Sequence, residues 1–175
     1  MKMNKLILAM ALIISPFIMN AQSQFDKFED IDGVTSVIVN QKAFAMMSKI
    51  GAESDDEYLN LIKNITTLKV FATEDTSVSK QMEVEVKSYL VKANLEELMR
   101  VKDGKSNVKI YVKEGKNEDF VKELFMFVKD GGDKSGHDQT VIIYLTGDID
   151  LKQISKLTEK MDLPGGEHLE KANKS

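Results

Sequence analysis

The chain has 175 residues, with 24 basic and 28 acidic side chains, a formal net charge of −4 and no cysteine. This length is enough for one ordinary domain with its own core. The acidic balance argues against nucleic acid as a partner, because phosphates need a positive surface, and the lack of cysteine excludes disulfides and thiol chemistry.

The first 21 residues have the pattern of a secretory signal peptide. Lys2 and Lys5 precede an apolar run over residues 6–19, and Ala21 is a small residue at a cleavage point. The run is short for a bilayer, which leaves an uncleaved anchor as the alternative. We therefore expect an exported protein, periplasmic or secreted, that begins at Gln22, carries a net charge of −6 and has no stable membrane span.

Residues 25–50 predict a helical turn, a strand and a helix. Phe25 and Phe28 are three apart, as on one helical turn. Val34 to Val39 is rich in β-branched residues and predicts a strand. Asn40 is a good N-cap for a helix that runs through Ile50, whose inner face would hold Ala43, Phe44, Met47 and Ile50.

Two more helices and a strand follow. Ser54 to Glu57 has the spacing of a capping box, and a helical stripe comes after it. Leu68 to Thr73 predicts a strand. Residues 74–77, Glu74 to Ser77, predict the start of a helix that runs to about Lys92. Apart from one apolar stripe, this helix is mostly polar, as is typical of a surface helix with one buried face. The apolar stripes are Tyr58, Leu61, Ile62 and Ile65 in the first helix and Val78, Met82, Val86, Tyr89 and Leu90 in the second.

The stretch Leu95 to Gly115 is the clearest two-stranded unit. Apolar and polar residues alternate on both sides of Asp103-Gly104, a turn signal. A loop from Asp103 to Ser106 would pair Val101 with Val108 and Met99 with Ile110 on one side.

The last third predicts a helix, a loop, a strand and a helix. Asn117 would cap a helix that carries Phe120, Val121, Leu124, Phe125 and Val128. Asp130 to Asp138 contains three glycines and no apolar residue, which predicts an exposed loop. Val141 to Thr146 predicts a strand, and Asp150 caps a final helix with Leu151, Ile154, Leu157 and Met161.

Together these elements predict one α+β domain over residues 22–163 and a flexible C-terminal tail over residues 164–175. The sheet should have about five strands, mixed or antiparallel, with helices mainly on one face, ferredoxin-like in spirit. Val70–Val78 and Ile143–Leu151 share an apolar, aromatic, apolar triplet followed by Thr and then Asp. This is a weak internal βαβα repeat, although turns from strand to helix favour Thr and Asp in any case.

Catalytic and metal-binding patterns are weak. His137 and His168 lack the paired spacing of a transition-metal site. Ser135 to Asp138 has the residue types of a catalytic triad, but neighbours in sequence cannot adopt its geometry. The carboxylate clusters fit helix caps and turns better than a calcium loop. We expect no enzyme activity, no metal and no cofactor.

One face of the predicted sheet is the best candidate for binding a partner. Aromatic side chains beside cations are common at protein contact surfaces. The face would serve an envelope protein or a second copy of the chain; alternatively it is covered within the chain or is plain exposed sheet. The candidate residues are Lys69, Phe71, Arg100, Lys109, Tyr111, Lys113 and Tyr144, with Ile142 beside them.

Three stretches resemble a known family: Phe25–Val37, Leu95–Gly104 and Leu145–Asp148. They resemble the Bacteroidota family catalogued as domain of unknown function 4252, and ELMRVKDG is the most specific part. The resemblance implies an exported envelope protein without an assigned activity, with a link to envelope signalling, and it supplies no catalytic residues. The leading hypothesis is therefore a non-enzymatic interaction module. A ligand-binding or hydrolytic protein with a cleft, or a structural homodimer, is the alternative.

Overall fold

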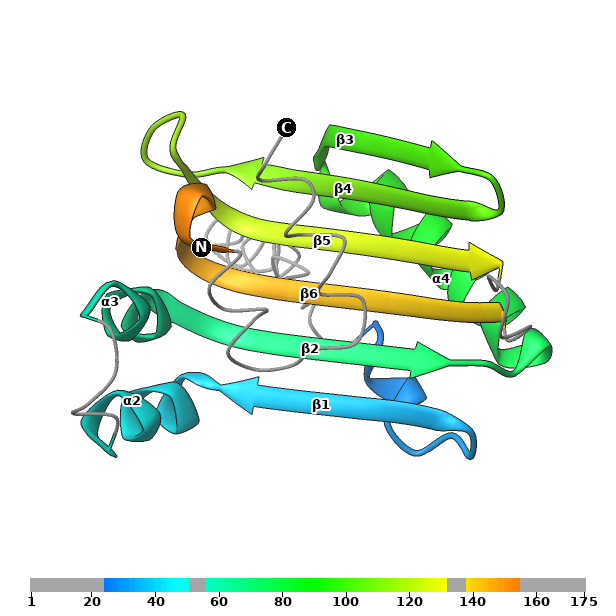
Figure 1. The fold of residues 1–175 in the computed structure, drawn as a ribbon, viewed down its shortest axis with the longest axis horizontal. Coiled ribbons are helices and arrows are strands. Elements are labelled where there is room, and N and C mark those ends of the chain that lie inside the picture. The colour runs from blue at the N-terminus through cyan, green and yellow to red at the C-terminus, as the bar shows by residue number, and fades with distance from the viewer. Residues whose placement is uncertain (1–23, 51–55, 132–137, 155–175) are drawn as a thin grey trace, which may run out of the picture.

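In the computed structural model, residues 24–50, 56–131 and 138–154 are described. Within them, six strands form one antiparallel sheet in the order β1-β2-β6-β5-β4-β3 (Figure 1). The strands are β1 Val34–Asn40, β2 Ile65–Thr73, β3 Glu96–Asp103, β4 Ser106–Glu114, β5 Phe120–Gly131 and β6 Asp138–Asp150. The helices are α2 Gln41–Ile50, α3 Asp56–Asn64 and α4 Thr76–Ala93, with short 3-10 turns η2 Asp26–Phe28 and η3 Leu151–Gln153.

The α+β class is confirmed, and so is the hairpin. Met99 pairs with Ile110 and Val101 with Val108, and the loop joins Asp103 to Ser106. The strands β3 to β6 follow one another as an antiparallel meander, so the ferredoxin-like detail is not confirmed. The βαβα repeat is wrong for the second half of the chain, because no helix stands between β5 and β6 in the described residues.

The helix expected after Asn117 is wrong, because Phe120–Gly131 forms the interior strand β5. A β-bulge lies between Val121 and Glu123. It places Val121 on the same face as Leu124, so their spacing of three mimics that of a helix. The strand is also buried on both faces, which removes the alternation of apolar and polar residues that marks a half-exposed strand.

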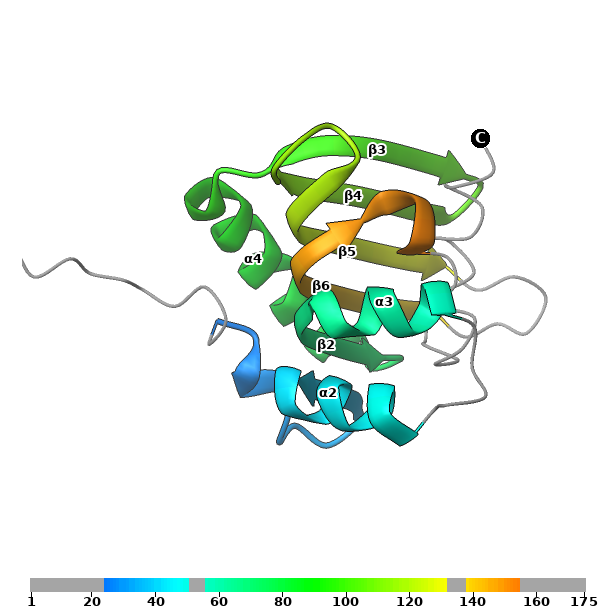
Figure 2. The same ribbon diagram turned by 90° about the vertical axis from the view of Figure 1, so that its left-hand side faces the viewer.

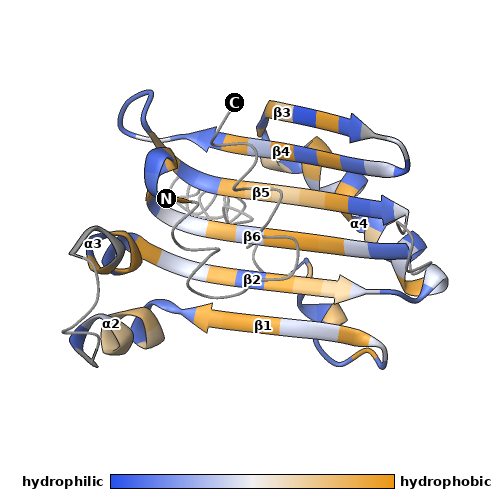
Figure 3. Cartoon of the chain, in the orientation of Figure 1, coloured by the Kyte–Doolittle hydropathy of each residue, from blue (hydrophilic) through white to orange (hydrophobic). Residues whose placement is uncertain are grey.

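Helices cover both faces of the sheet, and not mainly one, as Figure 2 shows. Side chains of α2 and α3 belong to the cluster on one face, together with Val70, Met126 and Ile143. Side chains of α4 and η2 belong to the cluster on the other face, together with Phe71, Phe125 and Tyr144. Figure 3 shows long apolar stretches along the interior strands β2, β6 and β5.

Local signals for the helix starts are confirmed. The Asn40 side chain accepts a hydrogen bond from the amide of Ala43 at 3.0 Å. Asp75 caps α4 by accepting from the amides of Ser77 and Val78, both at 2.8 Å. Phe25 and Phe28 flank the predicted turn and are buried. Met47, expected on an inner face, is instead exposed.

Several expectations lie outside the described residues. They are the signal peptide, Ser54 and Asp55 of the capping box, most of the glycine-rich loop, His137, His168, the helix beyond Ile154 and the tail. No described helix is long and apolar enough to cross a membrane.

Candidate functional site

The seven predicted contact residues do lie on one face of the sheet. Six of them lie in two neighbouring rows across the strands, and Lys113 pairs with Glu123 in the next row. In one row Tyr111 pairs with Phe125, Phe125 with Tyr144, and Tyr144 with Lys69. The other row runs from Arg100 through Lys109, Phe127 and Ile142 to Phe71. The prediction of which residues share a face therefore agrees with the strand register. What it missed is that α4 packs on this face.

The half of the face over β2 and β6 is covered by α4 and η2. Phe71 is 0% exposed, Tyr144 3% and Lys69 8%. Lys69 forms an ion pair with Asp26 of η2. These three residues belong to the interior, so they are not accessible to a partner while α4 and η2 are in place.

Contacts between aromatic rings pack α4 and the N-terminal residues against the sheet. The ring of Tyr89 from α4 lies 5.1 Å from that of Phe125 and 6.1 Å from that of Tyr144. Phe25 packs against both α4 and the sheet, with its ring 5.1 Å from Tyr89 and 5.5 Å from Phe125. Edge-to-face and offset arrangements of this kind add to the stabilisation from buried area.

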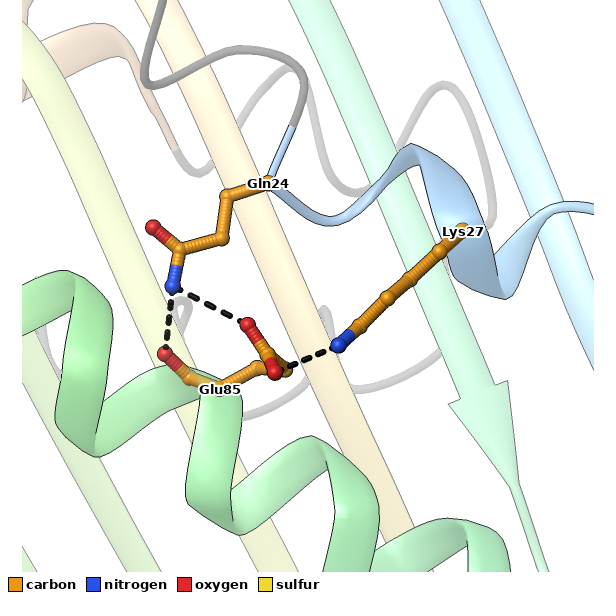
Figure 4. Close-up of polar contacts among 3 residues, drawn as sticks. All are labelled: Gln24, Lys27 and Glu85. Atoms are coloured by element: carbon orange, nitrogen blue, oxygen red, sulfur yellow. Dashed lines mark hydrogen bonds and ion pairs between the residues drawn. The ribbon is translucent and has the colours of Figure 1, made fainter. Parts of the chain in front are cut away.

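A polar contact ties the start of the described chain to α4 (Figure 4). The amide nitrogen Nε2 of Gln24 donates to the backbone oxygen and to Oε2 of Glu85, both at 3.1 Å. Lys27 forms an ion pair with the same carboxylate. The hydrogen bond from Lys27 holds the pKa of Glu85 below its usual value. The fold is thus anchored immediately after the expected cleavage point.

Glu123 is a buried carboxylate beneath α4. Burial raises its pKa, although the hydroxyl of Tyr89 donates a hydrogen bond to its Oε1 and Lys113 lies near enough to act against the shift. Burial also raises the pKa of Tyr89, and it raises the pKa of Tyr144 to about 12. Glu123 lines neither the groove described next nor the two polar hollows mentioned below.

The half of the face over β4 remains open and forms a groove against α4. Its volume is about 160 Å³. The apolar floor comes from Val86, Leu90, Tyr111 and Phe127, and the polar rim from Glu83, Lys87, Asn107, Lys109 and Lys129. Of the seven predicted residues, Lys109 and Tyr111 line this groove and are half-buried, while Arg100 and Lys113 are exposed.

Charge and hydrogen bonding define what the groove accepts. Lys129 is paired with Glu83, so Lys87 and Lys109 give the rim its excess positive charge. The Oδ1 atom of Asn107 is buried and has no hydrogen-bond partner among the described residues. This atom is shut off from solvent, so the lysines of the rim, and not this acceptor, are what the groove offers to a polar ligand.

An ion pair lies on β3, opposite Tyr111 and Lys109 of the groove. Nη2 of Arg100 donates to Oε2 of Glu97 at 2.6 Å. This hydrogen bond lowers the pKa of Glu97 and raises that of Arg100. Burial is the main cause that raises the pKa of Tyr111, whose neighbour in the row is Glu97. Tyr111 is therefore a neutral, half-buried aromatic residue whose hydroxyl can form hydrogen bonds.

Sequence reasoning missed the residues that α4 contributes, Val86, Lys87 and Leu90. The apolar stripe of α4 was visible, but the side of the sheet on which the helix packs carries no local signal. Two further hollows, at the end of the sheet where Thr73 and Thr140 lie, are lined mostly by polar groups such as Glu74, Gln139 and Asp138. The described residues contain no group of three or more His, Cys, Asp or Glu side chains placed to hold a metal ion.

Comparison with known proteins places the chain in a family without a known activity. No curated protein and no solved structure matches it. Residues 28–157 match the model of the family described as "Domain of unknown function (DUF4252)". The match covers β1 to η3 and most of the chain, so the protein belongs to the DUF4252 family.

Proposed function

We propose that this protein is an exported, non-enzymatic interaction module that binds an acidic peptide segment of a partner protein in the groove between α4 and β4. The observation that carries the proposal is the open half of the aromatic and cationic face, where Tyr111 stands among three lysines. The covered half serves the core. The groove and the exposed Arg100 and Lys113 are therefore the parts of the predicted surface that a partner can reach.

The chemistry of the groove supports a peptide with both acidic and apolar side chains. Lys87 and Lys109 favour carboxylates at the rim. Leu90, Tyr111 and Phe127 offer apolar area for one side chain at the floor.

The composition of the groove also supports binding rather than catalysis. Its described lining contains no serine, cysteine or histidine, so it offers none of the common pairs of nucleophile and base. The alternative, a hydrolytic or ligand-binding cleft, calls for a pair of carboxylates with raised pKa in a concave site. Glu123 has the raised pKa, but its partner is Tyr89 and it lies beneath α4.

Crosslinking in living cells tests the binding proposal. A photoreactive phenylalanine analogue replaces Tyr111, and the adducts are identified by mass spectrometry. We expect a discrete adduct with another protein, and the crosslinked peptide should be acidic. The matched probe replaces Lys42, an exposed residue of α2, and should give no such adduct. Adducts only between copies of the chain would instead show a homodimer, and an absence of adducts would remove the proposal.

Export has its own test, because it depends on residues 1–21. We expect the protein recovered from the cell envelope or the medium to have the mass of a chain that begins at Gln22. Gln24 is bonded to α4, so the folded domain starts two residues later. An intact Met1 on the mature protein in the cytoplasm would contradict export.

A further inference from the structure

The strand β3 forms one edge of the sheet, and its outer side is open. It is the last strand in the order β1-β2-β6-β5-β4-β3 and lies at the upper edge of the sheet in Figure 1. In the described part of the chain, no strand pairs with the backbone N–H and C=O groups on its outer side. Such an edge is a template on which a strand of another chain can pair.

Apolar side chains are exposed along this edge. Leu98 is 51% exposed and Val101 is 46% exposed, and Met99 between them is half-buried. Val101 pairs with Val108 of β4, so it points to the face opposite α4. Large apolar side chains that are exposed close together on an open edge favour contact with another protein.

The charges of β3 are arranged so that the strand complements itself when it is turned around. Glu96 and Glu97 begin the strand, and Arg100 and Lys102 follow them. Residues 97, 100 and 102 share the face on which α4 packs, because their partners on β4 line the groove. When two β3 strands pair antiparallel, the acidic start of each lies beside the basic part of the other. An edge of one sign would instead repel a second copy.

We infer that β3 pairs antiparallel with β3 of a second copy of this chain and forms a two-fold homodimer. One register satisfies both the charges and the apolar residues. It sets Glu97 opposite Lys102 of the second copy. The β-bulge between Glu97 and Met99 then sets Leu98 and Met99 together opposite Val101 of the second copy. In a two-fold interface each contact occurs twice, so both exposed apolar residues are covered in both chains.

The remaining charges of β3 tolerate this register. Arg100 lies near the two-fold axis, where it approaches Arg100 of the second copy. Each guanidinium already donates to Glu97 of its own chain at 2.6 Å, so the two arginines do not meet as unpaired charges. At each end of the strand pair Asp103 comes opposite Glu96 of the second copy. This repulsion lies at the solvated rim of the interface, where salt screens it.

The dimer leaves the groove of each copy open. Antiparallel strands of one sheet are related by a two-fold axis perpendicular to that sheet, so the α4 faces of both copies lie on the same side. Neither Glu97 nor Lys102 lines the groove. The inference therefore goes beyond the proposed function and does not depend on it.

Light scattering tests the inference on the protein purified from cells that express the full chain. We expect twice the mass of one chain at about 100 μM, because an interface made by one pair of strands is small and binds with modest affinity. Glu97→Lys alone and Lys102→Glu alone should each raise the dissociation constant about tenfold or more, since each change creates a repulsive pair on both sides of the axis. The chain with both changes has opposite charges facing again and should recover the dimer.

The other edge of the sheet supplies the matched control. The strand β1 carries no charged residue, so it lacks the self-complementary pattern of β3. Ile38→Lys places a charge at a residue of β1 that is 40% exposed, and it should leave the dissociation constant unchanged. Urea unfolding of every variant shows whether a lost dimer reflects a lost fold.

Disulfide formation tests the register without any change of charge. The natural chain has no cysteine, so Leu98→Cys and Val101→Cys each introduce a single thiol. When the two variants are mixed and mildly oxidised, we expect disulfides between different variants to exceed those between identical ones. The reason is that Leu98 lies opposite Val101 of the second copy, whereas the distance between two copies of the same position is longer.

The opposite results overturn the inference. A monomer at about 100 μM would show that the edge does not pair at the affinity expected for such an interface. A dimer that persists in both single charge variants, or one that the double variant fails to restore, would show that the charges of β3 do not form the contact. Loss of the dimer in Ile38→Lys alone would identify β1 as the interface, and a random mixture of disulfides would refute the register.

Discussion

At the scale of single residues, Glu123 shows what burial does to a charge. The residue is 8% exposed, and the pKa of its carboxyl is raised because desolvation outweighs the hydrogen bond from Tyr89. An acid whose pKa is higher in the folded state than in the unfolded chain destabilises the fold when it is ionised. This cost is present above the folded pKa and disappears as the pH falls below the unfolded pKa.

We expect Glu123→Gln to raise the free energy of unfolding at pH 7 by about 1 kcal/mol, because glutamine still accepts from Tyr89 but carries no charge. Near pH 4 the gain should shrink, since the wild-type carboxyl is then largely protonated. Urea unfolding at the two pH values measures this. Glu123→Ala, which leaves the Tyr89 hydroxyl without its acceptor, should cost about 1–3 kcal/mol. A glutamine variant less stable than wild type at pH 7 would contradict the assignment.

Gly147 is required by a close approach of two backbones. Its φ is +146°, and a Cβ atom there would lie 2.2 Å from the backbone oxygen of Asn64. We expect Gly147→Ala to destabilise the fold by about 3 kcal/mol or more, because the contact atoms belong to the backbone and cannot rotate away. Gly104→Asn is the matched control: its φ is +53°, nothing lies within 4 Å, and asparagine tolerates this conformation. Equal thermal melting temperatures for the two variants would refute this reading.

At the scale of elements, the sequence correctly predicted turns and helix starts, because one or two residues determine these features. Asp103-Gly104 set the register of the β3–β4 hairpin, and Asn40 and Asp75 marked the starts of α2 and α4. β5 was mistaken for a helix because its bulge and its burial on two faces both hide the period of two. The placement of α4 over Phe71 and Tyr144 depends on tertiary packing, which leaves no trace in the sequence of either element.

The N-terminal turn η2 is held by buried rings more than by its ion pairs. Phe25 is 1% exposed, whereas the side chain of Lys27 is 51% exposed in its ion pair with Glu85. We expect Phe25→Ala to lower the free energy of unfolding by about 3–5 kcal/mol and Lys27→Ala by at most about 1 kcal/mol. Chemical denaturation of the two variants measures this. Losses of similar size would mean that the polar contact in Figure 4 is the principal anchor.

At the scale of the whole molecule, the sheet separates a covered aromatic half from an open groove on one face. The sequence predicted that Lys69, Phe71, Tyr111 and Tyr144 share this face, and the strand register agrees. It did not reveal which of them a partner can reach, because the cover comes from α4 and η2. Only Lys109 and Tyr111 of the seven predicted residues line the groove, so the proposed binding site is smaller than the predicted surface.

The measurement that tests the account most directly is the yield of the adduct from a photoreactive residue at position 111 when the charge of the groove is reversed. We expect Lys87→Glu with Lys109→Glu to reduce the adduct about tenfold or more, because two attractive charges at the rim become repulsive. Lys92→Glu, which changes an exposed lysine of α4 outside the groove, should leave the yield unchanged. An undiminished adduct in the double variant would show that the groove does not recognise an acidic partner, and the proposal would fail.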